Sequence, residues 1–247
     1  MIALILDLDG VICDTAHFHF LAWHRLAAEY GYELTHDDNE KLKGVSRADS
    51  LKFILERANK SLTTAEFEAD LVRKNEWYLD LVKDMRPEDV LPGVPHFFAQ
   101  VEKLKLPLAL GSASKNATTV LNRVGLLDAF DAIVDAGQVK KGKPHPETFL
   151  TAADMIGFPP SQCIVFEDSL AGVQAAIAAG MRVIGIGKPV VERGLAVIER
   201  VALPVKLKVT IPAIDRIITK AVEDVSDDAM IDNQAGGADG HDQQDQR

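Results

Sequence analysis

Short, continuous apolar runs recur along the chain and predict the strands of a parallel sheet. They cover residues 2–6, 106–111, 132–135, 163–166 and 182–186. A strand that is apolar along its whole length is typical of a sheet covered by helices on both faces. Helical patterns separate the later runs, and Gly125, Gly157 and Gly180 lie where those helices would end. The alternation predicts a doubly wound, Rossmann-like α/β core.

The segment 14–86 has a different pattern, with several helical stretches and no convincing strand. Ser46 and Thr63 are each followed three residues later by an acidic residue, which is the arrangement of a capping box at a helix start. Pro87 and the Pro92-Gly93 pair indicate a return to the α/β pattern. We therefore expect a helical cap domain at 14–86, inserted into a core domain formed by residues 1–13 and 87–225.

Composition and charge narrow the function classes. The chain has 247 residues, of which 47% are hydrophobic, and a net charge of −10, which argues against nucleic acid or an anionic membrane as the main partner. Residues 226–247 hold six Asp and one Arg among Gln and Gly, and we expect this segment to be a disordered acidic tail.

Targeting and redox signals are weak. No apolar run approaches the about 18 residues of a membrane helix, and no basic-then-apolar leader begins the chain. The two cysteines, Cys13 and Cys163, are too few for a disulfide framework. These observations favour a cytoplasmic protein, and we expect a monomer that binds a small molecule.

Polar residues follow several predicted strands, where ligands bind in open α/β sheets. They are Asp7 and Asp9, Ser112, Lys143 in a Gly-Lys-Pro loop, and the pair Glu167 and Asp168. Four converging carboxylates would raise each other's pKa unless a cation neutralised them, and Mg²⁺ with oxygen ligands and a phosphate suits such a site. An Asp pair alone at a strand end is usually a turn former, so the combination with Ser112 and Lys143 carries this prediction.

The order and spacing of these residues resemble the haloacid dehalogenase superfamily. Asp7-Leu8-Asp9-Gly10-Val11 matches its first motif, Ser112 its second, Lys143 its third and Glu167-Asp168-Ser169 its fourth. Further segments resemble the β-phosphoglucomutase family within that superfamily. They are Asp14-Thr15-Ala16 with His19, Gly44-Val45-Ser46-Arg47, Arg73-Lys74-Asn75 and the run from Gly111 to Asn116.

The resemblance implies roles for the residues of the four motifs. Asp7 would be the nucleophile that becomes an aspartyl-phosphate, and Asp9 the general acid and base. Ser112 and Lys143 would hold the transferring phosphoryl group. Mg²⁺ would be bound by Asp7, by the backbone carbonyl of Asp9 and by Asp168, with Glu167 contacting it directly or through water.

A second set of residues would bind the substrate. Arg47 lies in the first turn of a predicted helix that begins at Ser46, and Ser114, Lys115 and Asn116 open a helix that we expect to run to Val124. Both groups are assigned to the phosphate remote from Asp7. The resemblance implies that His19 and Lys74 help to align the sugar and Asp9 as the cap closes, with Thr15 near the hinge and also among the substrate-binding residues. Taken alone, Arg47 would be a solvated surface arginine and Lys74 a solubilising lysine.

The activity implied by the resemblance is a Mg²⁺-dependent isomerisation. It interconverts β-D-glucose 1-phosphate and glucose 6-phosphate, with β-D-glucose 1,6-bisphosphate as the activating intermediate. A sugar-phosphate phosphatase uses the same four motifs with water as the final acceptor, and this hydrolase stays open as an alternative. A third alternative, a non-catalytic sugar-phosphate binder, is disfavoured because Asp7 and Asp9 are both present.

Overall fold

A five-stranded parallel sheet forms the centre of the core. The computed structural model describes residues 2–186, so the predicted tail at 226–247 and the last part of the predicted core domain lie outside the described residues. The strands are β1 (Ala3–Leu6), β2 (Leu108–Gly111), β3 (Ala132–Val134), β4 (Cys163–Glu167) and β5 (Arg182–Gly185). Their order is β3-β2-β1-β4-β5, and every pairing is parallel. The predicted doubly wound fold is confirmed.

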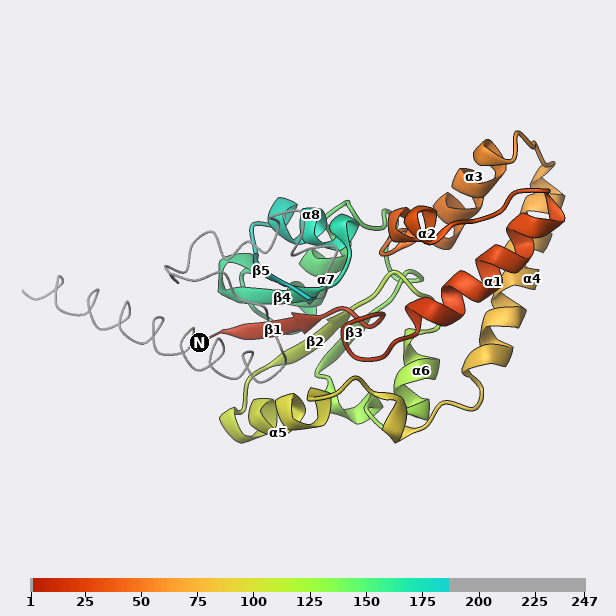
Figure 1. The fold of residues 1–247 in the computed structure, drawn as a ribbon. Helices are drawn as coiled ribbons and strands as arrows, with labels where there is room; N and C mark the ends of the chain where they lie inside the picture. The colour runs from red at the N-terminus through yellow and green to blue at the C-terminus, as the bar shows by residue number, and fades with distance from the viewer. Residues whose placement is uncertain (1, 187–247) are drawn as a thin grey trace, which may run out of the picture.

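Both faces of the sheet are buried, which explains the continuous apolar runs. Leu4 and Leu6 of β1 pack into one cluster, while Ala3 and Ile5 pack into another on the opposite face. Helices α5 (Val94–Leu104) and α6 (Ala117–Arg123) contribute to the first cluster, and α7 (Glu147–Met155) and α8 (Leu170–Ala178) to the second. Figure 1 shows α7 and α8 on one side of the strands and α5 on the other.

The first strand is followed by four helices with no strand among them. They are α1 (Ala16–Glu29), α2 (His36–Leu42), α3 (Arg47–Arg57) and α4 (Thr64–Val82). The Ser46 side chain caps α3, and Thr63 forms a capping box with Glu66 at the start of α4. These helices bury a cluster of their own that includes Trp23, Leu26 and Leu51. Their own core is consistent with the predicted cap domain, whose limits at 14 and 86 stay a prediction.

The carboxyl ends of the strands point toward the four cap helices (Figure 1). After β3 the chain crosses to β4 on the other side of β1, so β1 and β4 flank the topological switch point where ligands bind in such sheets. Three short 3₁₀ helices, η1 (Pro87–Asp89), η2 (Leu127–Ala129) and η3 (Pro160–Gln162), complete the described elements. Within residues 2–186, no helix is both long and apolar enough to cross a membrane.

One predicted helix start is wrong. Ser114 and Lys115 precede α6 and are not part of it, since the helix begins at Ala117 with Asn116 as its N-cap and ends at Arg123. Ser112 Oγ accepts a hydrogen bond from the Ser114 amide at 3.0 Å, and Ser114 Oγ accepts one from the Asn116 amide at 3.2 Å. Side-chain oxygens thus accept these amide hydrogen bonds in a turn, and the helix begins three residues later than predicted, at Ala117 instead of Ser114.

Candidate active site

Three carboxylates and one lysine meet at the switch point. Lys143 Nζ donates to Asp7 Oδ1 at 2.6 Å and to Glu167 Oε2 at 2.7 Å. Asp7, Glu167 and Asp168 each place an oxygen within 4.8 Å of the others, and all three residues are buried. Asp7 follows β1 and Asp168 follows β4, which pair residue by residue from Ala3 and Cys163 onward. The pairing of these two strands therefore brings the first and fourth motifs together.

Burial and mutual repulsion shift the pKa values of these carboxylates upward. Burial raises the pKa of Asp7 well above its ordinary value, and the charge of Glu167 adds to the rise although Lys143 opposes it. Burial and then Glu167 raise the pKa of Asp168 to about 8. Burial alone would lower the pKa of Lys143, but Asp7 and Glu167 outweigh it and leave that pKa raised. One ammonium group is thus shared by more carboxylates than it can neutralise.

Gly10 makes this close approach possible. Its φ is +79°, a conformation that residues with a side chain rarely adopt. A Cβ at this position would also overlap the carboxylate of Asp168. The glycine of the first motif therefore turns the chain and leaves room for the aspartate of the fourth.

Asp9 does not join the carboxylate cluster. Its Oδ1 accepts a hydrogen bond from the Thr15 hydroxyl and lies 3.8 Å from Nε2 of His19. Burial raises the pKa of Asp9, and the bond from Thr15 opposes the rise. The prediction that four carboxylates converge is therefore wrong for the Asp9 side chain, because the turn at Gly10 and helix α1 direct it to the cap. Whether its backbone carbonyl binds a metal stays a prediction.

Lys74 is deeply buried in the cap. It is 1% exposed, its Nζ lies 2.7 Å from His19 Nδ1, and it lies 4.6 Å over the ring of Trp23 and 5.0 Å over that of Tyr78. Burial and the charge of Arg47 hold the pKa of Lys74 well below its ordinary value. Burial and the charge of Lys74 also lower the pKa of His19. With Lys74 donating to Nδ1, the Nε2 proton of His19 faces Asp9.

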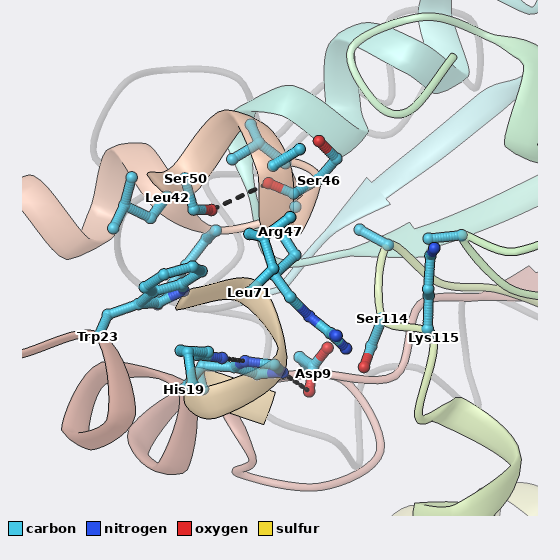
Figure 2. Close-up of a pocket in the computed structure, with 18 of the residues that line it drawn as sticks. Asp9, His19, Trp23, Leu42, Ser46, Arg47, Ser50, Leu71, Ser114 and Lys115 are labelled. Atoms are coloured by element: carbon cyan, nitrogen blue, oxygen red, sulfur yellow. Dashed lines mark hydrogen bonds and ion pairs between the residues drawn. The ribbon is translucent and has the colours of Figure 1, made fainter. Parts of the chain in front are cut away.

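A cavity of about 450 Å³ lies between the cap and the core. Eight of the predicted site residues line it, namely Asp7, Asp9, His19, Arg47, Lys74, Ser114, Lys115 and Asp168. Figure 2 shows Arg47 extending from α3 toward Asp9 and Ser114, which belong to the core. Burial lowers the pKa of Arg47, and no ion pair joins it to another described residue. The cavity is therefore lined by a cationic side chain that forms no ion pair with any carboxylate of residues 2–186.

The other predicted site residues are not among those that line the cavity. The Thr15 hydroxyl donates a hydrogen bond to Asp9, and Ser112 Oγ accepts one from the Ser114 amide. Asn116 Nδ2 donates to Asn75 Oδ1 of α4 at 2.8 Å. Lys143 is 2% exposed and lies against Asp7. Glu167 is fully buried, and its Oε1 accepts from the Ser169 amide and hydroxyl at 2.9 and 2.7 Å. These residues can position the groups that line the cavity.

Comparison with known proteins places the chain in a family. The model of the haloacid dehalogenase-like hydrolases matches residues 1–180. The chain belongs to the haloacid dehalogenase-like hydrolase family. It is 43% identical over 190 residues to the β-phosphoglucomutase of Bacillus subtilis, and the aligned region covers 76% of this chain and 84% of that protein. It is 33% identical over 204 residues to a phosphorylated carbohydrates phosphatase of Thermotoga maritima, over 78% of this chain and 92% of the relative.

A solved structure is similar as well. The β-phosphoglucomutase of Clostridium difficile superposes with a TM-score of 0.79 at 38% identity, over 90% of this chain and 99% of that one. Haloacid dehalogenase-like relatives of this chain thus include proteins named as mutases and as phosphatases. Membership of the family does not by itself decide between the two activities.

Within this haloacid dehalogenase-like site, two charged residues were not predicted. Lys43, at the C-terminal end of α2, places Nζ 3.6 Å from Asp168 Oδ2 and 2.9 Å from Glu40. It directly precedes the Gly44-Val45-Ser46-Arg47 segment, so its position in the sequence was a usable signal. Glu68 of α4 also lines the cavity, and no motif marked it. Trp23 is buried in the cap cluster and also borders the cavity.

The residues at the switch point fit a magnesium ion. Mg²⁺ prefers oxygen ligands and is typically held by one or two carboxylates together with a phosphate. Asp7, Glu167 and Asp168 supply carboxylate oxygens within reach of one ion. Burial and the charge of Glu167 raise the pKa of Asp168 although Lys43 lies beside it, and a bound cation would favour its ionised form. Because both Glu167 oxygens already accept hydrogen bonds, Asp7 and Asp168 retain the freer oxygens.

Proposed function

We propose that this chain is a Mg²⁺-dependent β-phosphoglucomutase, which interconverts β-D-glucose 1-phosphate and glucose 6-phosphate through a phosphorylated Asp7. The observation that carries the proposal is that one cavity is lined by Asp7 and Asp9 and also by a second group of polar residues, Arg47, Ser114 and Lys115. A mutase needs a place for the phosphate that does not react, whereas a phosphatase for small substrates does not. The similarity to two β-phosphoglucomutases supports this reading.

In the first transfer, an oxygen of Asp7 attacks the phosphorus of β-glucose 1,6-bisphosphate and the ester bond to the sugar breaks. Asp9 gives its proton to the departing sugar oxygen. The raised pKa of Asp9 supports its ability to hold that proton. Lys143, 2.6 Å from Asp7, lowers the repulsion between an anionic nucleophile and an anionic phosphoryl group.

In the second transfer, a hydroxyl of the sugar monophosphate gives its proton to Asp9 and attacks the phosphorus bound to Asp7. The bond between phosphorus and Asp7 breaks, and the bisphosphate forms. The bisphosphate then reverses its orientation before the next transfer. Arg47, Ser114 and Lys115 would bind the phosphate remote from Asp7 in either orientation, so the same contacts position both monophosphates.

The cap has two further tasks in this proposal. His19 lies between Lys74 and Asp9 and would fix the Asp9 carboxyl group against the sugar hydroxyl. Contacts between cap and core, such as Asn75 with Asn116, would exclude water from the phosphorylated Asp7. Bound Mg²⁺, held by Asp7 and Asp168, would supply positive charge to the phosphoryl oxygens.

The test supplies β-glucose 1-phosphate, Mg²⁺ and a trace of β-glucose 1,6-bisphosphate, and measures glucose 6-phosphate with a coupled dehydrogenase. We expect glucose 6-phosphate to form with little inorganic phosphate, and Asp7→Asn to abolish both the activity and the phosphorylated protein seen by mass spectrometry. Release of inorganic phosphate without glucose 6-phosphate would instead establish a sugar-phosphate phosphatase. The similarity to the Thermotoga maritima phosphatase is the reason for testing this second function.

A further inference from the structure

The cap side of the cavity differs chemically from its phosphate-binding parts. On helix α4, Glu68, Leu71 and Val72 are spaced i, i+3 and i+4, and all three line the cavity. Residues at this spacing share one helix face. Figure 2 shows Leu71 between Trp23 and Arg47. This face of α4 therefore presents two apolar side chains and one carboxylate to the ligand.

Glu68 is the only acidic residue that the cap contributes to the lining of this cavity, as far as residues 2–186 show. Four lysine and arginine side chains also line the cavity, namely Lys43, Arg47, Lys74 and Lys115, yet none of them forms an ion pair with Glu68. No hydrogen bond or ion pair joins Glu68 to any described residue. Its carboxylate is exposed and free to accept hydrogen bonds from a ligand.

The separation of charges limits which part of a substrate can lie beside Glu68. A phosphate dianion next to an unpaired carboxylate would be repelled, so both phosphates of a bisphosphate belong with the cations and the metal site. The hydroxyl groups of a sugar donate hydrogen bonds, and the carbon-bound hydrogens of its ring suit apolar side chains such as Leu71 and Val72. Val72 is 56% exposed in this position, which leaves it free to contact a ligand.

We infer that Glu68 is a specificity-determining residue that accepts a hydrogen bond from one ring hydroxyl of the substrate. This inference rests on the proposed function, because it assigns the sugar end of the same cavity. The substrate class is then a polyhydroxylated sugar phosphate whose ring lies against α4, with Leu71 and Val72 as the apolar contact. Glu68 takes no part in the phosphoryl transfer itself.

The experiment compares Glu68→Ala with Glu76→Ala, a change at a second exposed glutamate of α4 that does not line the cavity. We expect Glu68→Ala to raise the KM for β-glucose 1-phosphate about tenfold, the loss typical of a hydrogen bond to a charged group. The rate at which acetyl phosphate, which has no ring hydroxyls, phosphorylates Asp7 should stay within about twofold of the wild-type rate. Glu68→Gln keeps one neutral acceptor and should recover part of the affinity.

Deoxy analogues identify the contact. For 2-, 3- and 4-deoxy-β-glucose 1-phosphate, the effect of Glu68→Ala should vanish with the one analogue that lacks the bonded hydroxyl and persist with the others. The inference is overturned if Glu68→Ala behaves like Glu76→Ala, if acetyl phosphate is affected equally, or if the effect is the same with every analogue. Should the wild-type protein release phosphate and form no glucose 6-phosphate, the mutase proposal fails, but the same comparison still tests Glu68 through phosphate release.

Discussion

Lys74 is a buried ammonium group without a carboxylate partner, and replacing it with methionine should make the protein more stable and less active. Taking an ammonium out of water costs several kcal/mol even after the protein relaxes. A hydrogen bond to His19 offsets about 1–1.5 kcal/mol of this cost, and the rings of Trp23 and Tyr78 offset about 1–2 kcal/mol each. A small net cost of about 1 kcal/mol remains in the folded state.

Methionine has a similar length and keeps its contacts with both rings. We therefore expect Lys74→Met to raise the free energy of unfolding at pH 7 by about 1 kcal/mol, or the melting temperature by about 2–4 °C. Loss of the hydrogen bond to His19 should cost little stability, because the His19 side chain is 24% exposed and can bind water instead. The value of kcat/KM for β-glucose 1-phosphate should fall by about 10²-fold, because His19 would no longer be held against Asp9.

The pH dependence gives the sharper test. The pKa of Lys74 is lowered in the folded protein, so between that lowered pKa and the ordinary value of 10.5 the unfolded chain binds more protons than the folded one. The stability of the wild-type protein should gain a contribution as pH rises through this window, and Lys74→Met should lack it. The advantage of the variant at pH 7 should therefore shrink toward pH 10.

Urea unfolding at pH 7, 8, 9 and 10 measures this difference, and other titrating groups cancel between the two proteins. Lys60→Met, at an exposed lysine just after α3, is the control and should change neither stability nor activity. If Lys74→Met were less stable than the wild type at pH 7, or if the difference between them did not vary with pH, Lys74 would not be a costly buried cation.

Three further predictions concern the core and its contact with the cap. Gly10→Ala should lower the free energy of unfolding by about 2 kcal/mol or more, because the new side chain would have to adopt a φ of +79° and would overlap Asp168. An unchanged midpoint of urea unfolding would contradict this prediction. Asp168→Asn should weaken Mg²⁺ binding by about tenfold or more in calorimetry, whereas Asp154→Asn, at an exposed site on α7, should not. Asn75→Ala removes a hydrogen bond between cap and core worth about 1 kcal/mol, which should shift the equilibrium between closed and open cap about fivefold toward the open state. X-ray scattering should then show a larger radius of gyration. An unchanged radius would mean that this hydrogen bond does not keep the cap closed.

Much of the core could be predicted because the signals are local. The run at 2–6 contains β1, and Gly125, Gly157 and Gly180 all have a positive φ near the end of a helix. The order of the motif residues was enough to place Asp7, Lys143 and Asp168 together, since parallel strands bring their carboxyl ends to one edge.

The cap contacts could not be predicted in the same way. Lys74 lies among Arg73, Asn75 and Glu76, so its local sequence resembles an exposed face. Only the packing of α4 against α1 shows that it is buried, because that packing places His19 and Trp23 of α1 against the ammonium group. Asp9 is a similar case, since its spacing from Asp7 is local but its partners Thr15 and His19 come from the cap.

The choice between mutase and phosphatase depends on the cap for the same reason. In the proposed mechanism the chemistry of Asp7 with Lys143 is common to both activities, and the two differ only in whether a sugar hydroxyl or water reaches the phosphorylated Asp7. A hydroxyl competes with water when the substrate is held by its remote phosphate and by its ring. Arg47 and Glu68 both come from cap helices and line the same cavity, one cationic and one anionic. In the proposed function their charges would orient a molecule that has a phosphate at one end and hydroxyls along its side, and such orientation would favour transfer to sugar over transfer to water.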